Sequence, residues 1–144
     1  CNAVMALAGK GDEVIIPAPY WVSYPQMVLL ADATPVYIEA GIEQDFKITP
    51  AQLEAAITPA TRAIILCSPS NPTGSVYTQE ELEGLAEVLR RHERVIVISD
   101  EIYEHIPDKQ GLIAALTELY AETLNTLTDE PADDKGNATW EIVR

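Results

Sequence analysis

Up to about residue 100, the chain alternates between short apolar runs and longer segments whose apolar positions recur every three or four residues. The apolar runs are rich in β-branched residues and too short for helices, so they predict buried strands at 14–16, 36–38, 63–67 and 95–98. The periodic segments predict helices at 23–31, 50–57 and 79–92. Strands that are apolar on both faces and alternate with helices indicate an α/β domain with a mainly parallel sheet.

Two of the predicted helices begin with a recognisable capping pattern. Thr49 precedes a proline and is followed three residues later by Gln52, which is typical of an N-cap with a capping box. Thr78 repeats the pattern before helix 79–92. The buried face of that helix is expected to carry Leu82, Leu85, Ala86 and Leu89.

Four chemically distinctive residues are expected just past the carboxyl ends of the predicted strands, where parallel sheets bind ligands. Each also has an ordinary structural explanation. Trp21 could anchor a surface loop, Asp100 could cap a helix, and Tyr103 could be a core residue with a wet hydroxyl. Asn71, in the proline-rich loop 68–74, could belong to a simple strand-to-helix turn. Their convergence on one edge of the sheet favours a binding site.

Charge and cysteine content exclude several classes of function. The net charge of −14 argues against nucleic acid and anionic membrane surfaces as partners. No apolar run is long enough to cross a membrane. Cys1 and Cys67 provide neither metal-ligand spacing nor a disulfide framework, so no metal site is expected and a reducing cytoplasm is the expected location.

Three motifs in this order resemble the class I pyridoxal-phosphate-dependent aminotransferases, in particular the bacterial aspartate aminotransferase subgroup. They are PAPYWVSYP at 17–25, SPSNPTG at 68–74 and SDEIYE at 99–104. The likeness covers roughly residues 1–106. It implies a three-layer large domain of fold type I, here truncated, with pyridoxal 5′-phosphate (PLP) as cofactor.

The resemblance also implies roles for the four candidate residues. Trp21 would stack on the cofactor ring, and Asp100 would pair with the pyridine nitrogen. Asn71 would bind the phenolic oxygen of the ring, with Tyr103 sharing that oxygen. Asn71 and Trp21 would also contact the substrate. These residue types suit the cofactor, because it works as an electron sink best when a carboxylate keeps the ring nitrogen protonated.

The family also needs a lysine that forms a Schiff base, and the lysines of this chain lie in the wrong contexts. Lys10 and Lys47 fall in loops of the amino-terminal half, and Lys109 follows Asp100 too closely. Lys135 has two aspartates beside it, which would raise its pKa and suppress its nucleophilicity. The family's phosphate-binding turn and its substrate arginine are expected outside this sequence. The chain alone is therefore expected to be inactive.

The two ends of the chain suggest a fragment. Residues 1–9 have the pattern of the second half of a helix that ends at a glycine, with no start methionine. Residues 107–144 are expected to form a divergent tail: an amphipathic helix at 111–127, an acidic linker at 128–137 and a short strand at 139–143. This tail could be an unrelated segment joined by deletion, frameshift or fusion, or an insertion with the rest of the enzyme on another chain.

The sequence thus predicts a piece of an aminotransferase that moves an amino group between an amino acid such as aspartate and a 2-oxo acid such as 2-oxoglutarate. Aromatic amino acids or prephenate are the second choice of substrate. Two alternatives remain open: a non-catalytic remnant or interaction module, and one half of a split enzyme whose partner carries the lysine and arginine. The family implies a homodimer, although much of the interface-forming chain is absent from this sequence.

Overall fold

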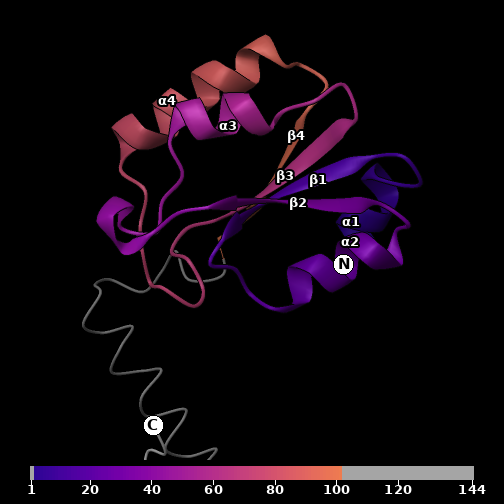
Figure 1. Cartoon of the computed structure of the whole chain (residues 1–144), viewed down its shortest axis with the longest axis horizontal. Coiled ribbons are helices and arrows are strands. Elements are labelled where there is room, and N and C mark those ends of the chain that lie inside the picture. The colour runs from indigo at the N-terminus through magenta and orange to yellow at the C-terminus, as the bar shows by residue number, and fades with distance from the viewer. Residues whose placement is uncertain (1, 102–144) are drawn as a thin grey trace, which may run out of the picture. The chain divides into compact units, whose positions relative to one another are not determined.

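The computed structural model describes residues 2–101, which form a parallel sheet with helices on both faces (Figure 1). Predictions for Tyr103, Lys109, Lys135 and the segments within 107–144 lie outside the described residues. The elements in chain order are α1 (Asn2–Leu7), β1 (Glu13–Ala18), α2 (Ser23–Leu30), β2 (Thr34–Glu39), the 3₁₀ turn η1 (Ile42–Gln44), α3 (Pro50–Ala56), β3 (Thr61–Cys67), α4 (Gln79–Arg91) and β4 (Ile96–Asp100).

The sheet confirms the predicted parallel arrangement. Its strand order is β2-β1-β3-β4, and every neighbouring pair runs parallel. Ile15 of β1 aligns with Val36 on one side and with Ile64 on the other. The chain therefore leaves β1 toward one edge and later returns to build the other edge. This places a topological switch point between the carboxyl ends of β1 and β3, where open α/β sheets bind ligands.

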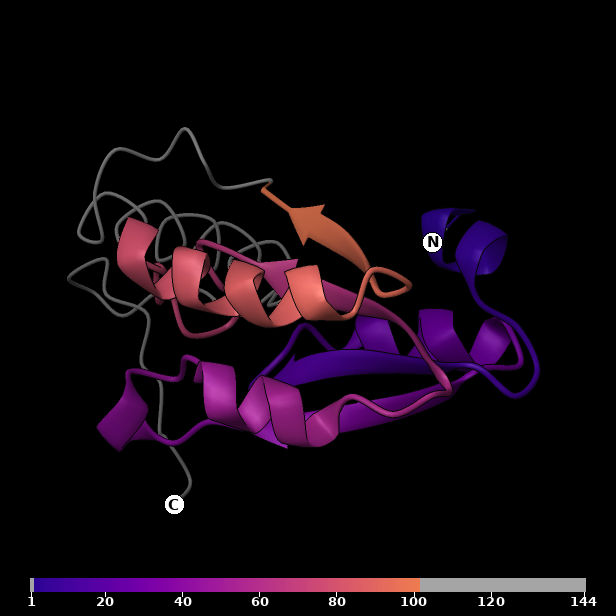
Figure 2. The same cartoon turned by 90° about the horizontal axis from the view of Figure 1, so that it is seen from above.

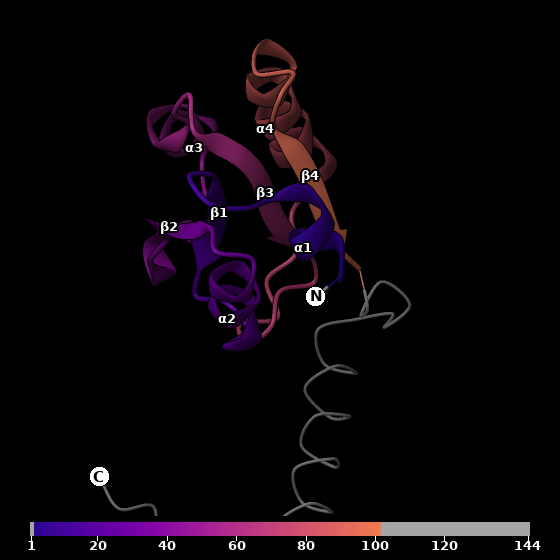
Figure 3. The same cartoon turned by 90° about the vertical axis from the view of Figure 1, so that its right-hand side faces the viewer.

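Two apolar layers hold the helices against the sheet. Figures 1 and 3 show α1 and α2 on one face and α3 and α4 on the other. Alternation along β1 explains the division, because Val14 and Ile16 pack with α1 and α2 while Ile15 packs with α3 and α4. All three side chains are fully buried. The central strand thus contributes to both cores.

The expectation that all four strands are covered on both faces is correct only for the central pair. Exposed side chains occur on both β2 and β4. In β2, Tyr37 is 45% exposed, and in β4, where exposure alternates along the strand, Val97 is 43% exposed. Figure 2, seen from above, shows β4 at the outer edge of the described sheet, beyond α4. Both exposed strands are edges of that sheet, where fewer elements are available to cover a strand.

The helix-start predictions are confirmed. The Thr49 side chain accepts from the backbone N–H of Gln52, and that glutamine completes a capping box. Thr78 and Glu81 form the same box at α4. The predicted buried face of α4 was partly wrong, because Leu82 is 38% exposed while Val88 is buried together with Leu85. The buried residues of α4 are Leu85 and Val88, and Leu82 lies about 90° around the helix from the midpoint between them.

The predicted glycine cap of the first helix is also wrong. Gly9 does not have a positive φ, whereas Gly11 does, at 91°. Asp12 closes the turn instead: its Oδ2 accepts from Gly9 N–H at 2.9 Å, and its own N–H donates to the Gly9 carbonyl at 3.0 Å. The carboxylate thus shapes the turn after α1, while the terminal Leu7 carbonyl of that helix accepts from Arg62 Nε at 2.9 Å.

Candidate functional site

A small pocket opens between the carboxyl ends of β1 and β3, at the switch point. Its free volume is about 20 Å³, roughly the space of one water molecule, so a larger ligand would bind across its rim. Three loops supply its walls: those after β1, after β2 and after β3. The lining residues are Pro17, Pro19, Tyr20, Tyr24, Phe46, Ile65, Leu66, Cys67, Ser70, Asn71, Ser75 and Tyr77.

The loop after β3 is held by hydrogen bonds within itself. Ser70 N–H donates to the Ser75 carbonyl at 2.9 Å, and Gly74 N–H donates to the Ser70 carbonyl at 2.7 Å. Gly74 has a φ of 70°, which only glycine adopts at little cost. These bonds close the loop into a compact turn that carries Asn71 to the pocket. The peptide bonds before Pro19, Pro69 and Pro72 are cis.

The most specific polar contact of this region joins α2 to the end of β4. Tyr24 is buried, at 5% exposure, and its hydroxyl donates to Oδ2 of Asp100 at 2.6 Å. Burial raises the pKa of the Tyr24 hydroxyl, and its hydrogen bonds with Asp100 and with the Cys67 thiol raise it further. The phenol therefore keeps its proton at neutral pH and remains a donor to the carboxylate.

The structure brings three of the four predicted site residues to the same edge. Trp21 is 41% exposed and packs edge-on against the ring of Tyr24, with centroids 5.6 Å apart. Asn71 lines the pocket beside that tyrosine. Asp100 is the last residue of β4 rather than a residue beyond it, and its carbonyl accepts from Ser68 N–H at 3.3 Å. The fourth residue, Tyr103, lies outside the described residues.

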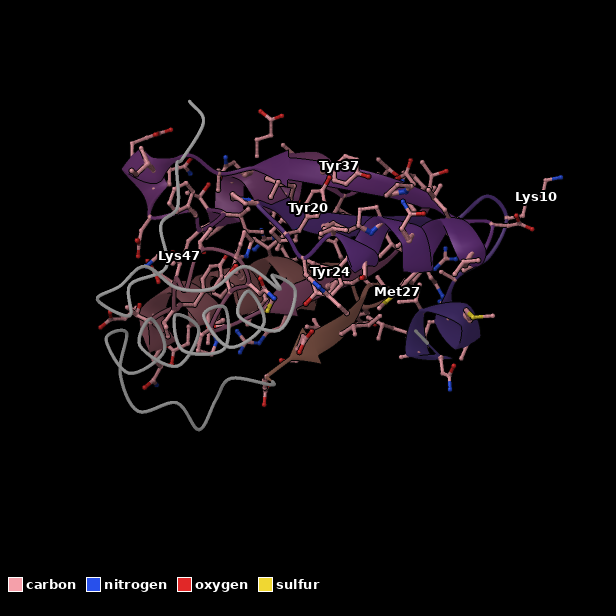
Figure 4. The ribbon with its side chains drawn as sticks, turned by 90° about the horizontal axis from the view of Figure 1, so that it is seen from below. Lys10, Tyr20, Tyr24, Met27, Tyr37 and Lys47 are labelled. Carbon is pink, nitrogen blue, oxygen red and sulfur yellow. The ribbon has the colours of Figure 1, made fainter. Side chains whose placement is uncertain are left out.

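Sequence reasoning missed the part that Tyr24 plays in this region. Within the predicted helix 23–31, Tyr24 has helical spacing with Met27 and Val28, which by itself favours only a core position; Tyr24 and Val28 are buried. The available signal was its place three residues after Trp21, on the first turn of a helix that follows a strand end. Figure 4 shows Tyr24 near Tyr20, whose ring stacks on Tyr37 with centroids 5.2 Å apart.

The loop between β2 and α3 forms the third wall, although the sequence indicated only a polar loop. Phe46 lines the pocket with a φ of 57°, an uncommon conformation for a bulky residue. Its neighbours hold it in place: Ile48 N–H donates to the Tyr77 hydroxyl at 2.9 Å, and Lys47 Nζ lies 2.8 Å from a carboxylate oxygen of Glu81. The loop is thus tied to the start of α4.

Neither lysine among residues 2–101 is suited to act as a nucleophile here. Figure 4 shows Lys10 and Lys47 at opposite ends of the fold. Lys10 lies in the turn before β1, at the amino ends of the strands. Lys47 is nearer the pocket, but its hydrogen bond with Glu81 raises its pKa and keeps the amine protonated. Lys109 and Lys135 lie outside the described residues.

No helix within residues 2–101 is long and apolar enough to cross a membrane. The same residues contain no cluster of three or more histidine, cysteine, aspartate or glutamate side chains placed to hold a metal ion.

Known proteins resemble this chain over most of its length. The model of the family Aminotransferase class I and II matches residues 2–128, and thus continues past residue 106, where the motif likeness was expected to stop. The aspartate/prephenate aminotransferase of Cereibacter sphaeroides is 63% identical over 105 residues, which cover 73% of this chain and 26% of that protein. A bifunctional aspartate aminotransferase and glutamate/aspartate-prephenate aminotransferase of Petunia hybrida is 54% identical over 126 residues, covering 85% and 26%.

Solved structures agree with these relatives. The aspartate aminotransferase from Rhizobium meliloti matches with a TM-score of 0.71 at 48% identity, over 73% of this chain and 26% of that one. An aspartate aminotransferase from Thermus thermophilus with maleate matches with a TM-score of 0.70 at 47% identity, over 73% and 27%. This chain spans about a quarter of the length of the curated relatives. With the family match, the parallel fold and these identities in agreement, the chain belongs to the class I and II aminotransferases.

Proposed function

We propose that this chain provides the ring-binding side of a PLP site in an aspartate aminotransferase-like enzyme. The observation that carries the proposal is the arrangement around the pocket at the switch point. Asn71 lines that pocket, and Trp21 and Asp100 both contact Tyr24, another residue of its lining, whose buried hydroxyl donates to the Asp100 carboxylate. The same proposal assigns residues 1–106 to the partial large domain and residues 107–144 to a separate tail.

The described residues fit the aromatic ring of PLP, the cofactor of aspartate aminotransferases in this family. Asp100 would pair with the ring nitrogen, and Trp21 would cover one face of the ring. Asn71 would donate to the phenolic oxygen, which Tyr103, beyond the described residues, would share. When bound, PLP acts as an electron sink for bonds at the α-carbon of an amino acid.

The protein side chains would set the conditions for that chemistry. A carboxylate beside the ring nitrogen favours its protonated form, because opposite charges stabilise each other at short range. The exposed indole of Trp21 provides a flat apolar surface that excludes water from one side of the ring. The Asn71 amide is neutral and would orient the ring, and with Trp21 it would contact the substrate.

The proposed substrates follow the names of the relatives. Aspartate would donate the amino group and 2-oxoglutarate would accept it, in agreement with the aspartate aminotransferases above. Prephenate is the second choice, since both curated relatives carry it in their names. A homodimer and a cytoplasmic location complete the proposal.

Binding of the cofactor is tested by equilibrium dialysis of the purified chain against PLP. Trp21→Ala should weaken binding about fivefold, because an aromatic stacking contact contributes about 1 kcal/mol. Leu30→Ala is a matched control, because this large apolar residue is 70% exposed at the far end of α2. It should leave the affinity unchanged. Absence of binding by the unchanged chain would refute the proposed site.

The chain alone is expected not to transaminate. Borohydride reduction of the chain with PLP, followed by mass spectrometry, should give no uniquely modified lysine. An assay with aspartate and 2-oxoglutarate should give no oxaloacetate. A single modified Lys135, or measurable turnover, would show that the chain carries its own nucleophilic lysine.

A non-catalytic interaction module is the second candidate, and the edge strand β4 favours it. Within residues 2–101, β4 pairs with β3 alone and exposes Val97 on its surface. Such an edge can pair with another chain. Light scattering and urea unfolding distinguish the PLP-binding domain from the interaction module. A monomer with one sharp unfolding transition favours a self-sufficient domain. Association with a broad transition favours the module.

A further inference from the structure

We propose that Tyr24 is a positioning residue that fixes the orientation in which the Asp100 carboxylate meets the ring nitrogen of PLP. This inference rests on the proposed function, because it assigns a role to a further side chain of the same site.

The geometry of the contact supports orientation as the role. The hydroxyl lies 2.6 Å from Oδ2 of Asp100, the distance of a charge-assisted hydrogen bond. Tyr24 lies in the first turn of α2, and Asp100 ends β4, 76 residues further along the chain. Without a fixed partner, an aspartate at a strand end can turn about two side-chain torsions. A hydrogen bond to one carboxylate oxygen restricts both torsions.

The chemistry of the partner matters as much as its position. A lysine or arginine in place of Tyr24 would neutralise the carboxylate and compete with a cationic ring nitrogen. A phenol orients the carboxylate without removing its charge. Burial and the neighbouring Asp100 and Cys67 groups raise the pKa of the Tyr24 hydroxyl, so it stays a neutral donor.

The ring of Tyr24 has a second contact that separates its two functions. Trp21 packs edge-on against it at an interplanar angle of 89°. The ring therefore supports the proposed stacking residue, while the hydroxyl supports the carboxylate. Tyr24→Phe keeps the ring contact with Trp21 and removes the hydrogen bond to Asp100, which makes it an informative variant.

The test compares the affinity of the full chain for two ligands by equilibrium dialysis. One is PLP, and the other is its 1-deaza analogue, in which a C–H group replaces the ring nitrogen. The unchanged chain should prefer PLP. Tyr24→Phe should lower the PLP affinity about tenfold, or about 1.4 kcal/mol, and leave the affinity for the analogue unchanged. Asp100→Asn should abolish the preference, and adding Tyr24→Phe to it should cause no further loss.

Two controls separate positioning from a general effect on folding. Leu30→Ala truncates an exposed side chain at the far end of the same helix as Tyr24 and should leave both affinities unchanged. Urea unfolding of every variant shows whether it is folded. Asp100→Asn changes the acceptor of the same hydrogen bond, so the test does not depend on the Tyr24 variant alone.

The remaining outcomes separate the inference from the proposed function. An equal loss of affinity for both ligands in Tyr24→Phe would show a purely structural role, and no loss would show no role; either result overturns the inference and leaves the proposed function standing. A chain that binds neither ligand overturns the proposed function, and with it the positioning role.

Discussion

The two ends of the central strands each carry a hollow and a hydroxyl–carboxylate cluster, yet only one end has the character of a ligand site. The hollow at the amino ends is the larger, about 340 Å³ against about 20 Å³ at the carboxyl ends. Thr58 and Thr61 line it, and both hydroxyls donate to Glu13. Size and polar contacts alone therefore do not distinguish the end that carries the proposed site.

The amino-end cluster is explained by the turn that it closes. The Thr61 hydroxyl accepts from Thr58 N–H at 2.9 Å, and the Thr58 hydroxyl accepts from Ala60 N–H at 3.1 Å. Both threonines thus satisfy backbone donors at the start of β3, while the Glu13 carboxylate accepts a hydrogen bond from each hydroxyl. No partner from outside the cluster is needed to account for these groups.

The carboxyl-end pair has a different character. The bond from Tyr24 to Asp100 serves no backbone group, and it lies among aromatic residues at the switch point of the sheet. The comparison teaches that a hydroxyl–carboxylate bond does not by itself indicate a site. Its place relative to the strand ends, and the aromatic surface beside it, make the difference.

The largest expected effect comes from breaking the carboxyl-end pair at Asp100. Asp100→Ala leaves the buried Tyr24 hydroxyl without its acceptor and should reduce the free energy of unfolding by about 1–3 kcal/mol. It should also remove the preference for PLP over the 1-deaza analogue. Urea unfolding and dialysis measure the two effects. If Asp100→Ala lost stability but still preferred PLP over the 1-deaza analogue, the contact at the carboxyl ends would be purely structural, like the cluster at the amino ends.

Breaking the amino-end cluster should change stability alone. Thr61→Val removes a buried hydroxyl and leaves Thr58 N–H without its acceptor, so the free energy of unfolding should fall by about 1–2 kcal/mol. The PLP affinity should stay the same. Thr61→Ser, which keeps the hydroxyl, is the control. A change in PLP affinity in the valine variant would contradict the division between the two ends.

A smaller effect is expected at the N-terminus of α4. Thr78→Ala removes the side chain that accepts from Glu81 N–H, and loss of such a cap costs about 1 kcal/mol. Urea unfolding measures it, and Thr78→Ser is the control. Because α4 starts near the pocket wall formed by Tyr77, an accompanying loss of PLP affinity would extend the site to this helix.

The smallest effect is expected from the pair between Lys47 and Glu81, and it should depend on pH. Lys47 lowers the pKa of Glu81, so the glutamate contributes stability above its unfolded pKa and loses it as the pH falls through the folded value. The raised pKa of Lys47 means that its contribution persists at neutral pH and is lost only in strong alkali.

Glu81→Gln tests this pair, because glutamine keeps the capping box and removes only the charge. At neutral pH it should destabilise the chain by less than about 1 kcal/mol, as is usual for a partly exposed pair. The difference from the unchanged chain should vanish in acid. A difference that persists in acid would assign the effect to packing.

Local sequence signals were sufficient for the helices and strands. Residues that are close in sequence determine a capping box or an apolar run, so the threonine caps of α3 and α4 and all four strands were predicted. The motifs likewise indicated Trp21, Asn71 and Asp100. Leu82 and the edge strands were predicted wrongly, because exposure depends on which elements pack nearby, and a single helix or strand does not contain that information.

Only the tertiary structure decided which residues meet. The contact between Tyr24 and Asp100 spans 76 residues, and its existence depends on the strand order that places β4 next to β3 and α2 beneath them. The entry of Phe46 and Tyr77 into the pocket walls depends on the same order. Amino-acid types and their local spacing thus determined the family and the elements. The crossing of the chain at the switch point determined which residues surround the pocket, because it brings distant segments to one edge of the sheet.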